Sequence, residues 1–242
     1  MAENEGITAI VGATGPTGTE LTRQLVKRGK RVRVISRDKQ RLETAFPDET
    51  VEKLDADALD PTGILDAVED CAAVVDCVGF PGKEMNRHPE VARNVAAAAK
   101  AADARCLQVS SYWGFIPIGE LPVTEDAERM HGPPWARHRR EAEDIFIESG
   151  AAVAHLPDFF GPGVHTSVLQ MAIREAAAGK PMSWIGRPNV ERDYIYVPDA
   201  MARVADLLEK DEAFGGRWII PGSGPGSANR IAASLTKILE QP

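Results

Sequence analysis

The chain has 242 residues, of which 43% are hydrophobic, so it is long enough for one large domain with a substantial core. Its formal net charge of −8 argues against nucleic acid and anionic membranes as principal partners. No apolar run approaches the roughly 20 residues of a membrane span, and no signal peptide is recognisable, so we expect a cytoplasmic protein without a membrane partner.

Strand-like and helix-like segments alternate along the first part of the chain. The predicted strands cover residues 7–11, 31–36, 51–55, 73–78, 106–110 and 152–156. The predicted helices between them cover residues 18–28, 38–45, 61–68, 89–102 and 135–149. Apolar strands with helical crossovers indicate an α/β fold with a doubly wound parallel sheet, the Rossmann fold, in which ligands lie at the carboxyl ends of the strands.

The pattern changes after residue 156. Prolines and glycines interrupt the sequence on both sides of a helix predicted at 167–178, and a last helix is predicted at 228–239. We therefore expect residues 1–156 to form mainly the Rossmann core. Residues 157–242 are expected to form mainly a small substrate lobe and C-terminal elements.

A glycine-rich loop joins the first strand to the first helix. Its glycines are spaced as Gly-x-x-Gly-x-x-Gly, and glycine lets the backbone turn tightly and approach phosphates closely. The unpaired amides at the start of the helix supply hydrogen-bond donors to a dinucleotide pyrophosphate. The residues expected at this site are Gly12, Thr14, Gly15, Pro16, Thr17 and Gly18.

The end of the second strand bears on the choice of cofactor. NAD sites usually carry Asp or Glu there, whereas this chain has Ser36 and Arg37, with Arg41 one turn further on. The Arg37 guanidinium could pair with a 2′-phosphate and Ser36 could donate a hydrogen bond, so NADP(H) is the preferred cofactor. Arg37 could instead begin a solvated helix, and NAD(H) would then still enter.

Cysteine and histidine residues show no metal-binding spacing. We expect Cys71, Cys77 and Cys106 to be buried small hydrophobes, and we expect no metal site.

Five segments carry a resemblance to a known family. They are Asp57-Ala58-Leu59-Asp60, Val78-Gly79, Val109-Ser110-Ser111, residues 156–163 and residues 192–200. With the glycine loop, they make the chain resemble, over nearly its full length, an extended or atypical short-chain dehydrogenase/reductase of the NAD-dependent epimerase/dehydratase family. The resemblance implies a single NAD(P)-binding domain over residues 1–242.

The resemblance also implies roles for individual residues. Asp57 and Ala58 would lie by the adenine, and Val78 and Gly79 along the ribose and pyrophosphate. Ser110, Arg139, Pro157 and Phe160 complete the expected cofactor site, with the last two near the nicotinamide. The expected substrate residues are Ser111, which would bind the substrate oxygen, and Tyr112, Trp113, Phe159 and Arg192. For Arg192, an ion pair with Asp193 or Asp199 is the alternative role.

The chain departs from the family at its catalytic Tyr-x-x-x-Lys motif. Trp135 stands in place of the tyrosine and Arg139 in place of the lysine, on one face of the predicted helix. Arg139 could still hold the nicotinamide ribose hydroxyls. An indole cannot exchange a proton with the substrate oxygen, as the tyrosine does.

Three outcomes are open. Another group could supply the proton, with Tyr112 the best placed and His131, Tyr194 and water behind it, although Tyr112 could also be a packing aromatic. The substrate could be activated enough to need no strong acid or base. The protein could also bind cofactor without turnover, as a redox sensor or scaffold.

We expect an NAD(P)-dependent oxidoreductase or epimerase/dehydratase-like enzyme acting on a small hydroxyl- or carbonyl-bearing substrate. The expected catalytic residues are Ser111, Tyr112, Trp135 and Arg139. The resemblance implies a possible homodimer interface through the helices at 89–102 and 135–149, which could equally pack on the sheet of their own subunit.

Overall fold

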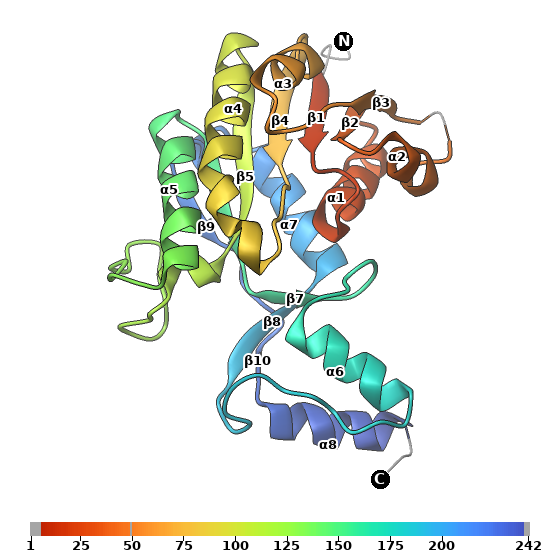
Figure 1. Ribbon diagram of the computed structural model, residues 1–242, viewed down its shortest axis with the longest axis vertical. Coiled ribbons are helices and arrows are strands. Elements are labelled where there is room, and N and C mark those ends of the chain that lie inside the picture. Colours follow the sequence, from red (N-terminus) through yellow and green to blue (C-terminus); the bar gives the residue numbers. More distant parts are fainter. Residues whose placement is uncertain (1–5, 49, 240–242) are drawn as a thin grey trace.

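The computed structural model of the protein describes residues 6–48 and 50–239. Its main sheet has seven parallel strands in the order β3-β2-β1-β4-β5-β6-β9 (Figure 1). Their bounds are β1 Ile7–Val11, β2 Val32–Ser36, β3 Glu52–Asp55, β4 Cys71–Asp76, β5 Arg105–Ser111, β6 Ala152–Leu156 and β9 Arg217–Ile219. The strand order reverses between β1 and β4, where dinucleotides bind in such sheets. The predicted doubly wound Rossmann fold is confirmed.

Helices cover both faces of this sheet. In Figure 1, α3, α4 and α5 lie over one face, and α1, α2 and α7 lie over the other. Their bounds are α1 Pro16–Lys27, α2 Lys39–Ala45, α3 Pro61–Ala67, α4 His88–Ala101, α5 Pro134–Glu148 and α7 Val197–Leu208. Successive residues of a strand point to opposite faces, so Ala9 joins the core under α4 and α5, whereas Ile10 joins the core under α1 and α7.

A second, smaller layer lies beyond the carboxyl ends of the main strands. It holds a three-stranded sheet of β7 (Asp158–Phe160), β8 (Arg192–Tyr196) and β10 (Pro225–Gly226). Helices α6 (Val168–Ala177) and α8 (Ala228–Leu239) pack against each other below it (Figure 1). This lobe therefore sits on the side of the sheet where the ligand is expected.

Two segments after residue 156 belong to the main core instead of the lobe. Met201, Val204 and Ala205 of α7 are fully buried in the core, where α7 packs against α1. The short strand β9 extends the main sheet beside β6. The chain thus crosses into the lobe and returns to finish the Rossmann core.

Some element ends differ from the sequence prediction. Helix α1 begins at Pro16, not at residue 18, because proline has no N–H to lose and is suited to the first helical position. Strand β4 was expected at 73–78 but runs from Cys71 to Asp76. It ends there because the Asp76 carboxylate accepts the Val78 amide at 3.0 Å and turns the chain.

Three short 3₁₀ helices complete the described part of the chain. They are η1 Gly82–Arg87, η2 Tyr112–Phe115 and η3 Asp211–Ala213. Within the described ranges, no helix combines the length and apolarity needed to cross a bilayer. Cys71, Cys77 and Cys106 are buried free thiols, as predicted.

Candidate functional site

The glycine loop has the geometry of a phosphate cradle. Gly12 has a φ of +79°, and a Cβ there would lie 3.0 Å from backbone atoms of Cys77 and Val78. A Cβ on Gly18 would lie 2.6 Å from the Gly12 carbonyl oxygen. Helix α1 begins after Gly15 without a side-chain cap. The loop therefore excludes side chains and leaves the positive end of α1 for an anion.

The end of β2 lies against the same loop. The hydroxyls of Ser36 and Thr14 are 3.2 Å apart, and Nη2 of Arg41 donates to the Thr14 carbonyl at 3.4 Å. Arg41 and Thr14 help line a shallow depression of about 330 Å³. Arg37, the first residue after β2, is exposed. The Asp38 carboxylate caps α2 by accepting a hydrogen bond from the Arg41 amide. Two cations, the expected Arg37 and also Arg41, thus follow the end of β2, where the adenosine ribose is expected.

The residues expected along the adenosine lie at the carboxyl ends of β3 and β4. Asp57 accepts the amide of Leu59 at 3.0 Å, which shapes the turn. Ala58 is buried, and its carbonyl accepts a hydrogen bond from Asn94 at 3.0 Å. A Cβ on Gly79 would meet no atom within 4 Å, so the backbone after Val78 borders open space.

Arg139 reaches the carboxyl ends of β4 and β5 from α5. Its Nη1 donates to Ser110 Oγ at 3.5 Å, and its buried Nε has no partner within the part of the chain that the structure describes. Burial lowers the pKa of Arg139, opposed by the carboxylates of Glu143 and Asp76. Burial also raises the pKa of Asp76 to about 7. A fixed cation with an unused donor suits ribose hydroxyls.

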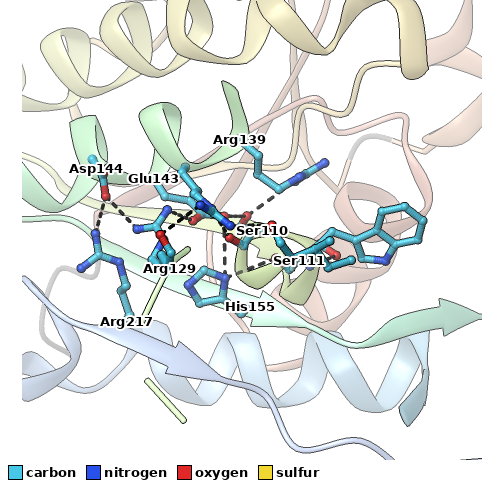
Figure 2. Close-up of polar contacts among 12 residues, drawn as sticks. Ser110, Ser111, Arg129, Arg139, Glu143, Asp144, His155 and Arg217 are labelled. Atoms are coloured by element: carbon cyan, nitrogen blue, oxygen red, sulfur yellow. Dashed lines mark hydrogen bonds and ion pairs between the residues drawn. The ribbon is translucent and has the colours of Figure 1, made fainter. Parts of the chain in front are cut away.

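A buried polar network stands behind Ser110 (Figure 2). Glu143 is fully buried and accepts from Ser110 Oγ at 2.6 Å and from Arg129 Nη2 at 2.8 Å. Arg129 and Arg217 both bind Asp144, at 2.8 and 2.6 Å. The network therefore fixes the side chain of Ser110, which accepts a hydrogen bond from Arg139.

His155 closes this network from β6. Its Nδ1 lies 3.4 Å from the Ser111 carbonyl oxygen and 3.7 Å from Glu143 Oε1. Burial lowers the pKa of His155, so the ring is neutral near pH 7. His155 therefore helps to hold the end of β5 in place, through its contact with the Ser111 carbonyl oxygen.

A second cluster gathers where β5 ends and β7 begins. Tyr112 donates to Asp158 Oδ2 at 3.2 Å, and the Trp113 indole N–H donates to Oδ1 at 2.8 Å. Arg192 Nη1 is 3.8 Å from the same carboxylate. The alternative role considered for Arg192, an ion pair, is thus present, but its partner is Asp158. The expectation of Asp193 or Asp199 was wrong.

The remaining predicted residues lie at the end of β5 and in or next to β7. Ser111 caps η2 by accepting the Trp113 amide at 3.3 Å. Phe160 packs against Tyr196, with ring centroids 5.7 Å apart, and Pro157 is buried. Phe159 packs against the main core, on the opposite face of β7 from Asp158. The structure therefore brings Tyr112, Trp113 and Arg192 together but not Phe159.

Sequence reasoning assigned no role to Asp158, Glu143 or Asp76. Each had a signal in the sequence: Asp158 comes two residues after the end of β6, and Glu143 lies four residues after Arg139 on the same face of α5. Asp76 ends an apolar strand, a position expected at the ligand crevice.

The fold and the phosphate cradle define a dinucleotide-binding Rossmann protein. Residues 12–154, more than half of the chain, match the NAD(P)H-binding family, and the chain belongs to that family. The expected resemblance is confirmed at the level of NAD(P) binding. A search of curated proteins finds no match.

Solved structures of epimerases and dehydratases share the fold. The epimerase Mth375 of Methanothermobacter thermautotrophicus is 20% identical with a TM-score of 0.87, covering 100% of this chain and 79% of that one. UDP-glucuronic acid 4-epimerase of Bacillus cereus, solved with UDP-glucuronic acid and NAD, is 18% identical with a TM-score of 0.86, covering 98% and 84%. dTDP-glucose 4,6-dehydratase of Bacillus anthracis, solved with NAD, is 12% identical with a TM-score of 0.87, covering 98% and 82%.

Proposed function

We propose that the protein is an NADP(H)-dependent oxidoreductase acting on a small carbonyl- or hydroxyl-bearing substrate. The observation that carries the proposal is Arg139. Its guanidinium rests on Ser110 at the carboxyl ends of β4 and β5, with a buried donor that has no partner among the described residues. Such a donor suits a ligand with hydroxyl acceptors, and the phosphate cradle is formed by the same edge of the sheet.

The residues present fit a dinucleotide. The loop from Gly12 to Gly18 and the start of α1 would hold the pyrophosphate, and Arg139 would hold the nicotinamide ribose. When bound, the nicotinamide supplies or accepts hydride. The protein's own part is to position Ser111 beside the substrate oxygen and to keep Ser110 and Arg139 fixed.

The charge at the end of β2 supports a preference for NADP(H). The strand ends in Ser36, a neutral hydroxyl, and both Arg37 and Arg41 follow it. Arg41 already reaches the glycine loop through the Thr14 carbonyl. A 2′-phosphate would meet two cations there, whereas a carboxylate suited to a ribose 2′-hydroxyl is replaced by Ser36.

Tyr112 is held away from the role of proton donor. Its hydroxyl donates a hydrogen bond to Asp158. Burial raises the pKa of Tyr112, and the Asp158 carboxylate raises it further. A phenol in this state gives up its proton less readily than a free one. Trp135 cannot act as an acid at all. We infer that the protein acts on a substrate activated enough to need no strong side-chain acid.

Fluorescence titration with NADPH and NADH tests the cofactor assignment. Arg41→Ala should weaken NADPH binding by roughly ten- to a hundredfold and leave NADH binding unchanged, since one charge-assisted contact is worth about 1.5–3 kcal/mol. Arg230→Ala, which removes an exposed guanidinium paired with Glu191 in the lobe, is the matched control. Equal loss of both cofactors in Arg41→Ala would argue against the preference.

Turnover separates this function from a cofactor sensor. Tyr112→Phe should retain activity within a few-fold, because its hydroxyl is engaged by Asp158. Loss of activity in that variant would instead assign Tyr112 as the donor. Tight NADPH binding with no turnover until Trp135→Tyr is introduced would identify a sensor, which the tryptophan in place of tyrosine favours as the second candidate.

A further inference from the structure

Three aromatic side chains form a cluster at the expected substrate position. The rings of Trp113 and Trp135 are 5.4 Å apart and tilted by 57°, and those of Tyr112 and Trp113 are 6.4 Å apart and tilted by 58°. All three side chains are partly exposed. Trp135 stands one helical turn before Arg139, and Tyr112 follows Ser111 directly. The aromatic cluster therefore borders both residues proposed to face cofactor and substrate.

Asp158 fixes the edges of this cluster. It accepts the Trp113 N–H at 2.8 Å and the Tyr112 hydroxyl at 3.2 Å, and Arg192 lies 3.8 Å away to balance its charge. The polar atoms of both rings are thus directed at one carboxylate. Their ring faces are what remains for contact with a ligand.

This surface offers a polyhydroxyl ligand few free hydrogen-bond partners, because the Tyr112 hydroxyl and the Trp113 N–H both donate to Asp158. Sugar hydroxyls need several free donors and acceptors, and unpaired ones are costly when desolvated. Flat aromatic faces instead stack on a planar ring, in offset or tilted arrangements, with a gain of about 0.5–1.5 kcal/mol beyond the buried area.

Resting on the proposed oxidoreductase function, we propose that the substrate is a planar, conjugated carbonyl compound of the quinone class, bound against the faces of Trp113 and Trp135. Such an acceptor explains how the site can work with tryptophan in place of tyrosine. The negative charge that forms on reduction is delocalised over the ring, so no side chain has to donate a proton during hydride transfer.

The overall reaction balances with NADPH as reductant. The hydride, carrying two electrons, leaves the reduced nicotinamide and forms an O–H bond at one quinone oxygen. The other oxygen carries the negative charge until it takes a proton from water. One quinone, one NADPH and one proton thus give one hydroquinone and one NADP⁺.

Two matched substrates test the proposal on the full chain. Tetramethyl-1,4-benzoquinone is planar and conjugated and has no free ring position to alkylate the protein. Cyclohexane-1,4-dione has the same carbonyl spacing around a saturated ring. Because a missing proton donor costs about 10²–10⁴ in rate, kcat/KM for the dione should be at least about 10²-fold lower, after subtraction of the uncatalysed rate.

Two substitutions of Trp135 separate stacking from hydrogen bonding. Trp135→Leu should weaken equilibrium binding of the quinone by roughly five- to tenfold, measured by calorimetry without NADPH, whereas Trp135→Phe should stay within about twofold. NADPH affinity should be unchanged in both variants, and thermal melts check that both are folded.

The outcomes distinguish this inference from the proposed function. Reduction of the dione at a rate equal to that of the quinone overturns the quinone assignment and leaves an oxidoreductase. Equal quinone binding by the wild type and Trp135→Leu also overturns it. If the wild type binds NADPH and neither substrate oxidises it, the quinone inference is overturned; if turnover then appears only in Trp135→Tyr, the proposed function is overturned as well.

Discussion

Glu143 offers the sharpest test of the buried network. Glu143→Gln keeps the shape of the side chain and removes its charge. Glu143 is fully buried, its Oε2 receives Arg129 at 2.8 Å, and a Cβ on Gly114 would lie 2.8 Å from its Oε1, so the carboxylate has no room to move. Arg129, whose side chain is 17% exposed, keeps only the half-exposed Asp144 as a charged partner.

The expected loss of stability follows from this geometry. Removing one partner of a buried ion pair costs about 3–5 kcal/mol, and the amide retains part of the hydrogen bonding, so we expect about 3 kcal/mol. For a chain of this length the melting temperature should fall by about 6–12 °C. Urea denaturation followed by circular dichroism gives the free energy directly, through a shift of the midpoint.

The same helix provides a matched control. Glu141 pairs with Arg93 at 2.7 Å, and the two side chains are 49% and 59% exposed. Glu141→Gln should therefore cost no more than about 1 kcal/mol. If the two variants differ by less than 1 kcal/mol, the network contributes no more than a surface pair, and the reasoning from burial is refuted.

Two further predictions concern the cofactor end of the sheet. Gly18→Ala should abolish detectable NADPH binding, because the new Cβ would lie 2.6 Å from the Gly12 carbonyl oxygen, whereas Gly82→Ala, which meets no atom within 4 Å, should bind normally; equal affinities would contradict the close approach. Burial raises the pKa of Asp76 to about 7, above its ordinary 3.8, so its neutral form favours folding at low pH and this contribution is lost as pH rises through about 7. The wild type should therefore lose stability relative to Asp76→Asn between about pH 4 and pH 7 in urea titrations, with little further loss above that range, and a constant difference would show that the carboxyl does not titrate there.

The part of the fold set by local patterns could be predicted from the sequence. The alternation of strands and helices and the glycine loop identified the Rossmann core, and the last helix was predicted with the bounds that α8 has. The least complete part was residues 192–208, where the structure has β8 and α7: residues 192–200 were interpreted as a motif, and no element was predicted over residues 201–208. The apolar spacing of Val197, Met201, Val204 and Leu208 carried the signal for α7.

The polar partners in the site could not be predicted in the same way. Which cation meets Glu143 depends on a loop that returns Arg129 to α5 from fourteen residues earlier. Which carboxylate meets Arg192 depends on the register of β7 with β8, which sets Asp158 opposite Tyr194. Neither pairing leaves a trace in local periodicity, because both join residues from different elements.

Under the proposed function, one physical explanation covers both replacements that the family resemblance implies, Trp135 and Arg139. The Arg139 guanidinium is planar and always charged, unlike a lysine ammonium, and it reaches Ser110 from α5. Ser110 in turn donates a hydrogen bond to the buried carboxylate of Glu143, one turn after Arg139 on the same helix. In our proposal Arg139 is the fixed cation that binds the cofactor, and Trp135, whose ring packs on Trp113, stands where the proton donor would be. On this proposal the site would bind a dinucleotide but would lack a side chain to protonate an alkoxide. Its chemistry then depends on what the substrate itself can stabilise, and a conjugated acceptor meets that requirement.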